Sequence, residues 1–176
     1  MQGWIKVGIK EGGKVSAVDL VIVNDGGATG GGSGNSSAQH VTIAYQPENM
    51  RYRGISVYTN TTPRGAQRGP GQNEMAAVLA PMTDRAADAV GMDRVAFRRA
   101  NVVDSDGFQG GSQGPLTSAF VREALDQGQR LFGWQDKVSA PKNMGGSKVR
   151  GVGVGIGYHG AGGRGYDGLL RIGTDG

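Results

Sequence analysis

The sequence has no cysteine, and this absence removes several kinds of site. A chain without thiols supplies no disulfide framework, no thiolate metal site, no iron–sulfur ligands and no cysteine nucleophile. Long apolar runs are also missing, because none approaches the ~20 residues that a membrane-spanning helix needs. The sequence therefore predicts a soluble chain whose own chemistry does not depend on thiols.

Aromatic residues are few, with 4 Phe, 5 Tyr and 2 Trp against 34 glycines among 176 residues. Apolar residues make up 37 % of the chain, which is below the roughly 45–50 % of an ordinary globular protein. A chain of this length can still bury about two-thirds of its unfolded surface, so we expect one domain with a thin core. The two histidines, His40 and His159, stand far apart, and we interpret them as ordinary polar residues rather than metal ligands.

The first third of the sequence predicts strands. Apolar residues alternate over residues 4–10 and 15–23 on either side of a glycine turn, which predicts a hairpin. The alternation is imperfect, so we expect a bulge or burial on both faces. Residues 54–60 carry β-branched and aromatic side chains at strand spacing and predict a third strand.

Between the hairpin and the third strand, residues 24–39 consist almost entirely of small residues. Such a run cannot bury enough apolar surface to offset its ordering entropy, so we predict a glycine-rich loop that is flexible; an anion-cradling loop is the alternative. No Gly-Lys-Ser or Gly-Lys-Thr closes the run, and no helix signal follows the glycines. Neither a phosphate loop nor a nucleotide-binding fingerprint is therefore supported.

The pattern then changes to a helical period. Apolar residues recur at intervals of three and four from Met75 and predict a helix that ends at Gly91. Pro81 lies inside this helix and either kinks it or marks a second start. Asp93 is a good N-cap for a second helix over residues 94–103, so the two helices form a helical hairpin.

The last third of the chain mixes one helix with extended segments. A third apolar stripe predicts a helix over residues 117–134, after a loop over residues 104–115. Residues 148–160 alternate valine or isoleucine with glycine, which predicts a strand whose glycine face is approached closely by another backbone or a ligand. Residues 168–176 predict a further strand that reaches a turn with no partner strand behind it.

The sequence TNTTPRGAQRGPGQNEM, residues 59–75, contains two Arg-Gly pairs and two prolines directly before the first helix. From Asn49 to Asn73 the chain has four arginines and no acid. Guanidinium charge and a helix N-terminus both favour a bound anion, while the glycines expose bare amides and the prolines stiffen the loop. We interpret the Arg-Gly loop, residues 61–72, as a positively biased wall for an anionic group; a solvated basic turn is the alternative.

Two linked motifs resemble the molybdenum-binding subunit of the xanthine dehydrogenase and aldehyde oxidase family. The segment VYTNTTPRGAQRGPGQNEM is similar to that family's Thr-Asn-x-x-x-x-x-Ala-Phe-Arg-Gly-Phe-Gly-x-Pro-Gln. The segment MTDRAADAVGMDRVAFRRANVV resembles its Met-Asp-x-x-Ala-x-x-x-Gly-x-Asp-Pro-x-x-x-Arg-x-x-Asn. The resemblance covers nearly the whole chain. It implies an α+β fold of mixed or antiparallel strands with a helical hairpin and a third helix, with residues 1–176 forming a single partial molybdopterin-binding domain.

The resemblance also implies an oxidoreductase that hydroxylates aldehydes or N-heterocycles with water as the oxygen source. Its cofactor would be a molybdenum–pterin, either molybdopterin or its cytosine dinucleotide form, with iron–sulfur clusters and FAD in partner subunits or domains. Carried onto this sequence, the family's loop puts Gln67, Arg68 and Gly69 against the cofactor, Arg68 at the metal centre and Pro70 at the wall of the substrate pocket. We expect a cytoplasmic location, with the periplasm as the alternative.

The sequence departs from the family at two places. Pro70 and Gln67 stand where the family has aromatic residues, so stacking of a flat heterocycle on this loop, and hence purine specificity, is not supported. The family's glutamate base and its glycine-glutamine pterin motifs have no match here, and we interpret the glutamates Glu11, Glu48, Glu74 and Glu123 as surface or helix-start charges. The chain therefore resembles an internal piece of a larger molybdenum subunit, and no catalytic residue is assigned.

Two other functions remain open on the sequence alone. The first is an Arg-Gly nucleic-acid binder, because five arginines directly precede a glycine. They are Arg53, Arg64, Arg68, Arg150 and Arg164. The second is an inactive structural fragment, which would share the same fold and differ only in having no activity.

Overall fold

The structure, a computed structural model, describes most of the chain. The described residues are 2–31, 34–65, 67–105, 107–108, 115–116, 118–140, 142–158, 168 and 171–174. The predicted turn at residues 175–176 and residues 169–170 of the predicted strand over 168–176 lie outside them, and the described residues of that range form no strand.

The molecule is built on a three-stranded sheet in the order β1-β2-β3. Strands β1 (Gln2–Ile9) and β2 (Val15–Asp25) form the predicted antiparallel hairpin. The register shifts between Gly8 and Ile9, which confirms the predicted bulge. Strand β3 (Asn49–Val57) lies beside β2 and runs parallel to it, so the sheet is mixed.

Helix α1 (Gly34–Ala44) connects β2 to β3, and it overturns part of the loop prediction. The sequence predicted a loop over residues 24–39 with no helix behind it, but only the first part of that range is a turn, with a short 3-10 helix at Gly27–Thr29. The physical reason is tertiary, because a parallel strand pair needs a crossover connection. Val41 and Ile43 are buried when the helix packs, which stabilises a helix that its glycine and serine residues alone would not hold.

Helices α2 (Gln72–Ala89) and α3 (Arg94–Asn101) form the predicted helical hairpin. Helix α2 runs without interruption through Pro81, so of the two alternatives, a kink or a second start, the second start is not observed. Gly91, at the turn between the helices, has a φ of 66°, a conformation that favours glycine. The N-cap prediction at Asp93 is confirmed, because its Oδ1 accepts hydrogen bonds from the amides of Val95 and Ala96, both at 2.9 Å.

The third predicted helix is two helices, α4 (Val121–Phe132) and α5 (Trp134–Ser139). Gly133, with a φ of 66°, separates them. The predicted strand over residues 148–160 has no ladder partner among its described residues, apart from an isolated bridge between Asn143 and Val149. No helix within the described residues is long and apolar enough to cross a lipid bilayer.

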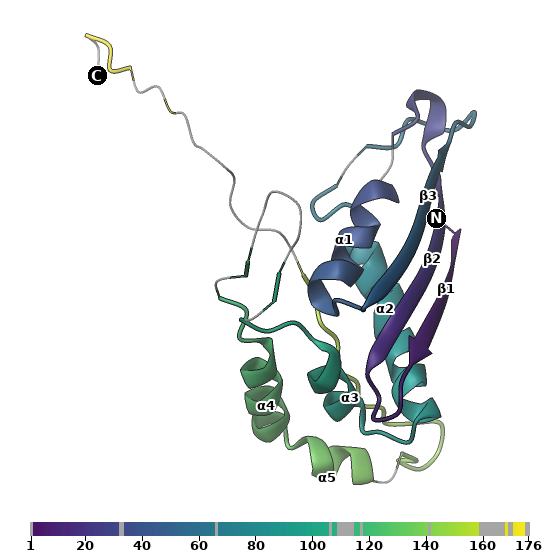
Figure 1. Cartoon of the computed structure of the whole chain (residues 1–176), viewed down its shortest axis with the longest axis vertical. Helices are drawn as coiled ribbons and strands as arrows, with labels where there is room; N and C mark the ends of the chain where they lie inside the picture. Colours follow the sequence, from purple (N-terminus) through teal and green to yellow (C-terminus); the bar gives the residue numbers. More distant parts are fainter. Residues whose placement is uncertain are drawn as a thin grey trace.

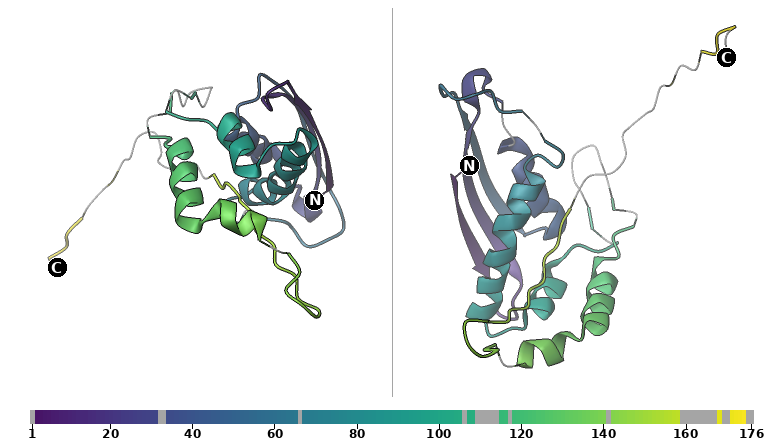
Figure 2. Two further views of the ribbon diagram at one scale, coloured as in Figure 1. Left: turned by 90° about the horizontal axis from the view of Figure 1, so that it is seen from below. Right: turned by 180° about the vertical axis from the view of Figure 1, so that it is seen from behind.

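The elements form layers that Figures 1 and 2 show from three sides. Helices α1 and α2 cover one face of the sheet, and α4 and α5 lie on the far side of these helices from the sheet. Core residues come from β2, α1, α2 and α3. They include Val18, Leu20, Ile22, Val41, Met75, Leu79 and Phe97. Each fully buried side chain of this size contributes about 1.5–3 kcal/mol to the stability of the fold. The core is therefore stabilising although it is small.

Candidate functional site

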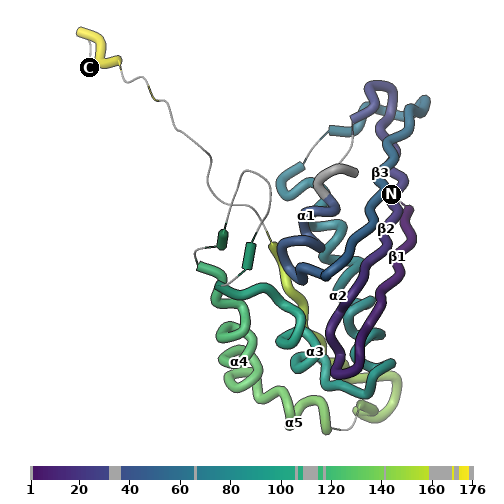
Figure 3. Tube along the Cα trace, viewed as in Figure 1, coloured from purple at the N-terminus to yellow at the C-terminus, as the bar shows by residue number. Residues whose placement is uncertain are grey.

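The bend of the Arg-Gly loop, Gln67–Gly71, leads directly into α2, and Figure 3 shows the chain entering this helix beside α1. Gly69 has a φ of 74° and is buried, whereas the Gln67 and Arg68 side chains are exposed. Asn73 holds the bend from inside the helix: its side chain donates to the Arg68 carbonyl at 3.0 Å, and its amide donates to the Gly69 carbonyl at 3.2 Å. The bend is therefore fixed through its carbonyls.

The backbone amides of the same bend differ from its carbonyls in their hydrogen bonding. Within the described residues, the backbone N–H groups of Gln67, Arg68 and Gly69 make no hydrogen bond. The Arg68 guanidinium likewise makes no hydrogen bond or ion pair there. Gly69 is buried whereas Gln67 and Arg68 are exposed, so these unbonded amides beside a guanidinium are accessible and are an arrangement that suits a bound anion.

The N-terminus of α2 contributes less positive potential than the sequence suggested. The Glu74 carboxylate accepts the Gly71 amide at 2.8 Å, in a capping-box arrangement, and its charge offsets the helix dipole. The interpretation of Glu74 as a helix-start charge is thereby confirmed. Any anion at the bend must bind through the amides of residues 67–69 and Arg68 and not through the first turn of α2.

The glycine turn at Gly26–Gly31 packs against the other end of the Arg-Gly loop. The Arg64 amide donates to the Gly26 carbonyl at 3.4 Å, and the Ala28 amide donates to the Thr61 carbonyl at 3.3 Å. A Cβ at Gly27, whose φ is 64°, would lie 2.4 Å from the Thr62 carbonyl oxygen. Glycine is thus required here because two backbones touch.

Asp25 clamps these two loops together. Its Oδ1 accepts hydrogen bonds from the Gly27 amide at 2.9 Å and the Thr59 hydroxyl at 2.5 Å, and Oδ2 lies 3.5 Å from the Arg64 guanidinium. The bond from Thr59, followed by that from the Gly27 amide, lowers the pKa of Asp25 to about 2. Arg64 is therefore used within the fold and is less available to a ligand than Arg68.

The described Arg-Gly pairs do not gather into one surface. Arg53 lies on β3, Arg64 is paired with Asp25, Arg68 is at the bend, and Arg150 follows α5, while Arg164 lies outside the described residues. A nucleic-acid groove needs a continuous basic track, and the described arginines do not form one. The structure gives the nucleic-acid interpretation no support.

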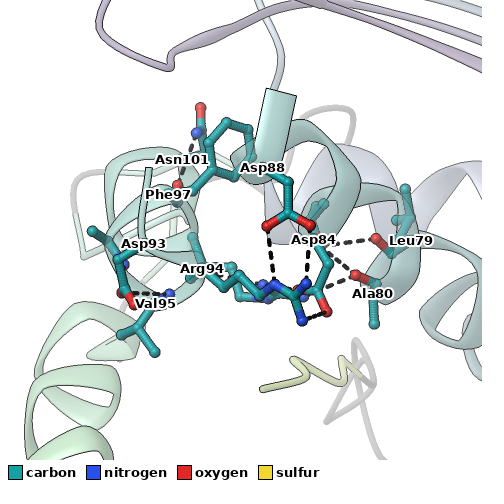
Figure 4. A network of polar contacts seen from close by, with 12 residues as sticks. Leu79, Ala80, Asp84, Asp88, Asp93, Arg94, Val95, Phe97 and Asn101 are labelled. Carbon is teal, nitrogen blue, oxygen red and sulfur yellow. Dashed lines mark hydrogen bonds and ion pairs between the residues drawn. The ribbon is translucent and has the colours of Figure 1, made fainter. Parts of the chain in front are cut away.

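A second polar cluster, at the junction of α2 and α3, contains four charged residues that sequence reasoning had not singled out (Figure 4). Arg98 is fully buried, with Nη1 lying 2.7 Å from Asp84 Oδ1 and Nη2 donating to the Ala80 carbonyl at 2.9 Å. Arg94 bridges Asp84 at 3.2 Å and Asp88 at 2.9 Å. These residues tie α3 to α2 and serve the fold.

Two further residues of this region connect separate parts of the chain. The Asn101 side chain accepts the Val15 amide at 2.8 Å and donates to the Gly13 carbonyl at 2.8 Å, which joins α3 to the β1–β2 hairpin. Asp93 Oδ2 accepts a hydrogen bond from Trp134 Nε1 at 2.7 Å, which joins α3 to α5. The second sequence motif is therefore structural, and only the first lies at a candidate site.

His40 is the one residue whose environment differs most from the sequence interpretation. It lies in α1, is fully buried, and neither ring nitrogen makes a hydrogen bond within the described residues. Burial lowers the pKa of His40 and favours the neutral imidazole. His159 lies outside the described residues. Across the described part of the chain, no three His, Cys, Asp or Glu side chains gather so as to hold a metal ion.

Comparison with known proteins was made at the level of families, sequences and structures. The model of the molybdopterin cofactor-binding domain family matches residues 1–102, which include the Arg-Gly loop. The chain is 31 % identical over 157 residues to the putative xanthine dehydrogenase molybdenum-binding subunit XdhA of Escherichia coli K12, covering 85 % of this chain and 20 % of that protein. It is 36 % identical over 101 residues to a probable xanthine dehydrogenase subunit of Bacillus subtilis, covering 56 % of this chain and 14 % of that protein. The chain thus spans a fifth or less of the length of these relatives.

Solved structures that share the fold include two oxidoreductases. The aldehyde oxidoreductase of Desulfovibrio gigas superposes with a TM-score of 0.67 and 24 % identity, over 77 % of this chain and 15 % of that one. The quinoline 2-oxidoreductase of Pseudomonas putida 86 superposes with a TM-score of 0.62 and 20 % identity, over 77 % of this chain and 18 % of that one. At this level of identity the two structures establish the fold alone.

Proposed function

Because this chain belongs to the molybdopterin cofactor-binding domain family, we propose that it supplies one wall of a molybdenum–pterin site in a molybdenum hydroxylase. The observation that carries the proposal is the bend at Gln67–Gly69, with three unbonded amides beside the Arg68 guanidinium, which has no partner within the described residues. Such a bend favours an anion, and a molybdenum–pterin with its oxygen ligands and phosphate is anionic. The residues present therefore fit the group.

The described residues hold no side-chain cluster that could ligate a metal. We therefore propose that the amides of Gln67, Arg68 and Gly69 bind the cofactor at its oxygen atoms, and that the Arg68 side chain adds charge there. When bound, the group supplies two-electron oxidation with transfer of a water-derived oxygen to an aldehyde or an N-heterocycle. Pro70, next along the bend, would face the substrate.

None of the four glutamates, all of which lie within the described residues, is placed as a general base for that reaction. Glu48 is paired with Lys10 at 2.6 Å, and Glu74 caps α2. Glu11 is exposed in the hairpin turn, and Glu123 is exposed in the first turn of α4. Since a base must lie within hydrogen-bond reach of the reacting water, we propose that it comes from outside residues 1–176.

The location of the other redox groups and the contact with the substrate are also proposals. Relatives such as XdhA are described as molybdenum-binding subunits, and this chain has no cysteine for an iron–sulfur cluster. We propose that iron–sulfur and flavin groups reside in partner subunits or domains. Pro70 offers no flat ring, so stacking of the substrate on this bend is not part of the proposal.

The test is the molybdenum and pterin content of the assembled subunit that contains residues 1–176. Arg68→Ala is expected to lower the retained molybdenum about 10- to 100-fold on dilution, because a charged hydrogen bond contributes about 1.5–3 kcal/mol. Arg53→Ala is the matched control, since Arg53 is also exposed and precedes a glycine, and its side chain makes no hydrogen bond or ion pair within the described residues. Equal molybdenum content in both variants, or an assembled subunit without molybdenum, would refute the proposal.

A further inference from the structure

The segment Gly151–Tyr158 is extended and alternates in burial. Val152, Val154 and Ile156 are half-buried, while the four glycines at 151, 153, 155 and 157 are exposed. Val154 and Ile156 face a groove lined by α4 and by Val95 of α3. The views in Figures 1 and 2 agree that the segment runs alongside α3 and α4. One face of this segment is therefore anchored to the fold.

The backbone of the same segment is unused. Within the described residues, no N–H or C=O group of Gly151–Gly157 takes part in a hydrogen bond. Seven consecutive extended residues, held on one face by packing, thus present two open edges. Half-buried backbone groups normally have partners, and an open strand edge is a template for another strand.

The glycine face is open as well. A Cβ built at Gly151, Gly153, Gly155 or Gly157 would meet no atom within 4 Å. The sequence predicted that another backbone or a ligand approaches this face closely, and within the described residues no backbone does. Glycine inside a strand costs stability unless something uses the space, so the space points to a neighbour outside the described residues.

The charges near this segment indicate what kind of strand would bind to it. Residues 137–158 contain four cations and no acid. Lys142 and Arg150 stand opposite each other across a short hairpin, where the Arg150 amide donates to the Lys142 carbonyl at 2.7 Å. Like charges placed opposite each other on paired strands are destabilising. Asp88 lies in the same pocket as both, but it is already bound by Arg94 at 2.9 Å.

We propose that Gly151–Gly157 receives a β-strand from outside residues 1–176, and that this strand carries an acidic side chain beside Lys142 and Arg150. Backbone hydrogen bonds supply the affinity, and the acidic residue sets the register against the two cations. The inference rests on the proposed function in one respect, because the strand is supplied by the remainder of the molybdenum subunit. It adds an assembly surface that is separate from the Arg-Gly loop.

Amide hydrogen exchange tests the proposal directly. In the isolated chain the amides of residues 152–157 are expected to exchange at the rate of an unstructured peptide. In the assembled subunit at least three of them are expected to exchange slower by a factor of about 100 or more, because strand amides open only with part of the sheet. Unchanged exchange on assembly overturns the proposal. Protection already present in the isolated chain also overturns it, because the partner would then lie within residues 1–176.

Two variants sharpen the result. Gly155→Pro removes one N–H from the edge without removing any contact in the isolated chain, so assembly should weaken about tenfold or more while the circular dichroism of the isolated chain is unchanged. Arg150→Glu should weaken assembly about as much, whereas Arg130→Glu, on the exposed side of α4, should not. Full assembly of both test variants contradicts the proposal.

Molybdenum content is measured in the same samples, so that the two proposals are tested separately. Protected amides without molybdenum would refute the proposed function alone, and molybdenum without protected amides would refute this inference alone.

Discussion

Two arginine-rich regions of this molecule are organised in opposite ways. At the α2–α3 junction, Arg94 and Arg98 are bound to Asp84, Asp88 and main-chain carbonyls of the same fold. At the bend before α2, Arg68 is exposed, and it makes no such bond within the described residues. Both regions carry the same residue type in the same short part of the chain. They differ in whether the arginine side chains have partners within the fold.

The two regions together show how to separate structure from function in an arginine-rich sequence. At the α2–α3 junction, arginine side chains form ion pairs with Asp84 and Asp88 and donate a hydrogen bond to the Ala80 carbonyl. At the bend, the backbone carbonyls are satisfied by Asn73, while the amides of residues 67–69 are left without a partner among the described residues. The bend is thus satisfied at its carbonyls and open at its amides, and the following predictions probe this asymmetry.

The largest expected effect is at Arg98. Arg98→Ala removes a fully buried guanidinium and leaves the Asp84 carboxylate, 22 % exposed, with only its longer ion pair to Arg94 at 3.2 Å. Breaking a buried pair from one side costs about 3–5 kcal/mol of unfolding free energy, which urea titration measures. Arg99→Ala is the control, because its pair with Asp126 is half exposed and screened by solvent, so its loss should change the unfolding free energy little. Similar losses in the two variants would mean that the junction is not the structural centre we describe.

A smaller effect is expected where the two loops touch. Gly27→Ala places a Cβ 2.4 Å from the Thr62 carbonyl oxygen at a φ of 64°, so backbone must move. The left-handed conformation alone costs about 1–2 kcal/mol, and displacement of the Arg-Gly loop adds to it. Gly12→Ala isolates the conformational part, since Gly12 has a φ of 82° and open space around it. If Gly12→Ala destabilises the chain as much as Gly27→Ala in thermal unfolding, the contact between the two loops contributes nothing to the stability of the fold.

Much of the regular structure was predictable because local signals and tertiary packing agree. The β1–β2 hairpin, the Asp93 cap and the helix ending before Gly91 each have a short-range cause that the sequence displays. Helix α1 was not predictable, because its stability comes from burying Val41 and Ile43 under a parallel crossover and not from helix propensity. Gly133, an αL residue, splits the predicted third helix into α4 and α5, and the apolar stripe does not show it.

The candidate site was predictable in its location but not in its hydrogen bonds. Glycines and prolines around Arg68 indicated a bare, stiff bend, and the bend exists. The sequence did not indicate that Glu74 takes the Gly71 amide, because a capping box depends on side-chain geometry. It also did not indicate the clamp at Asp25, which lies 34 residues before Thr59 in the sequence. Long-range hydrogen bonds of this kind leave no periodic signal.

The Asp25 clamp predicts a pH dependence confined to the loop region. The pKa of Asp25 is lowered from 3.8 to about 2, chiefly by the hydrogen bond from Thr59. Because the folded pKa lies below the unfolded one, the stabilisation is present above pH 3.8 and is lost as the pH falls through about 2. The difference in unfolding midpoint between wild type and Asp25→Asn should therefore be constant above about pH 4, and it should shrink between about pH 4 and 2. A difference that stays constant throughout this range would contradict the clamp.

The smallest expected effect is the one that distinguishes the two regions most sharply. Arg68→Ala in the isolated chain should change the unfolding free energy by less than about 0.5 kcal/mol, because the side chain is exposed and no described residue binds it. Urea titration beside Arg98→Ala makes the contrast quantitative within one experiment. A loss above about 1 kcal/mol would show that Arg68 is used by the fold, as Arg98 is. Arg68 would then no longer be available to an anion, and the unbonded amides beside it would need another explanation.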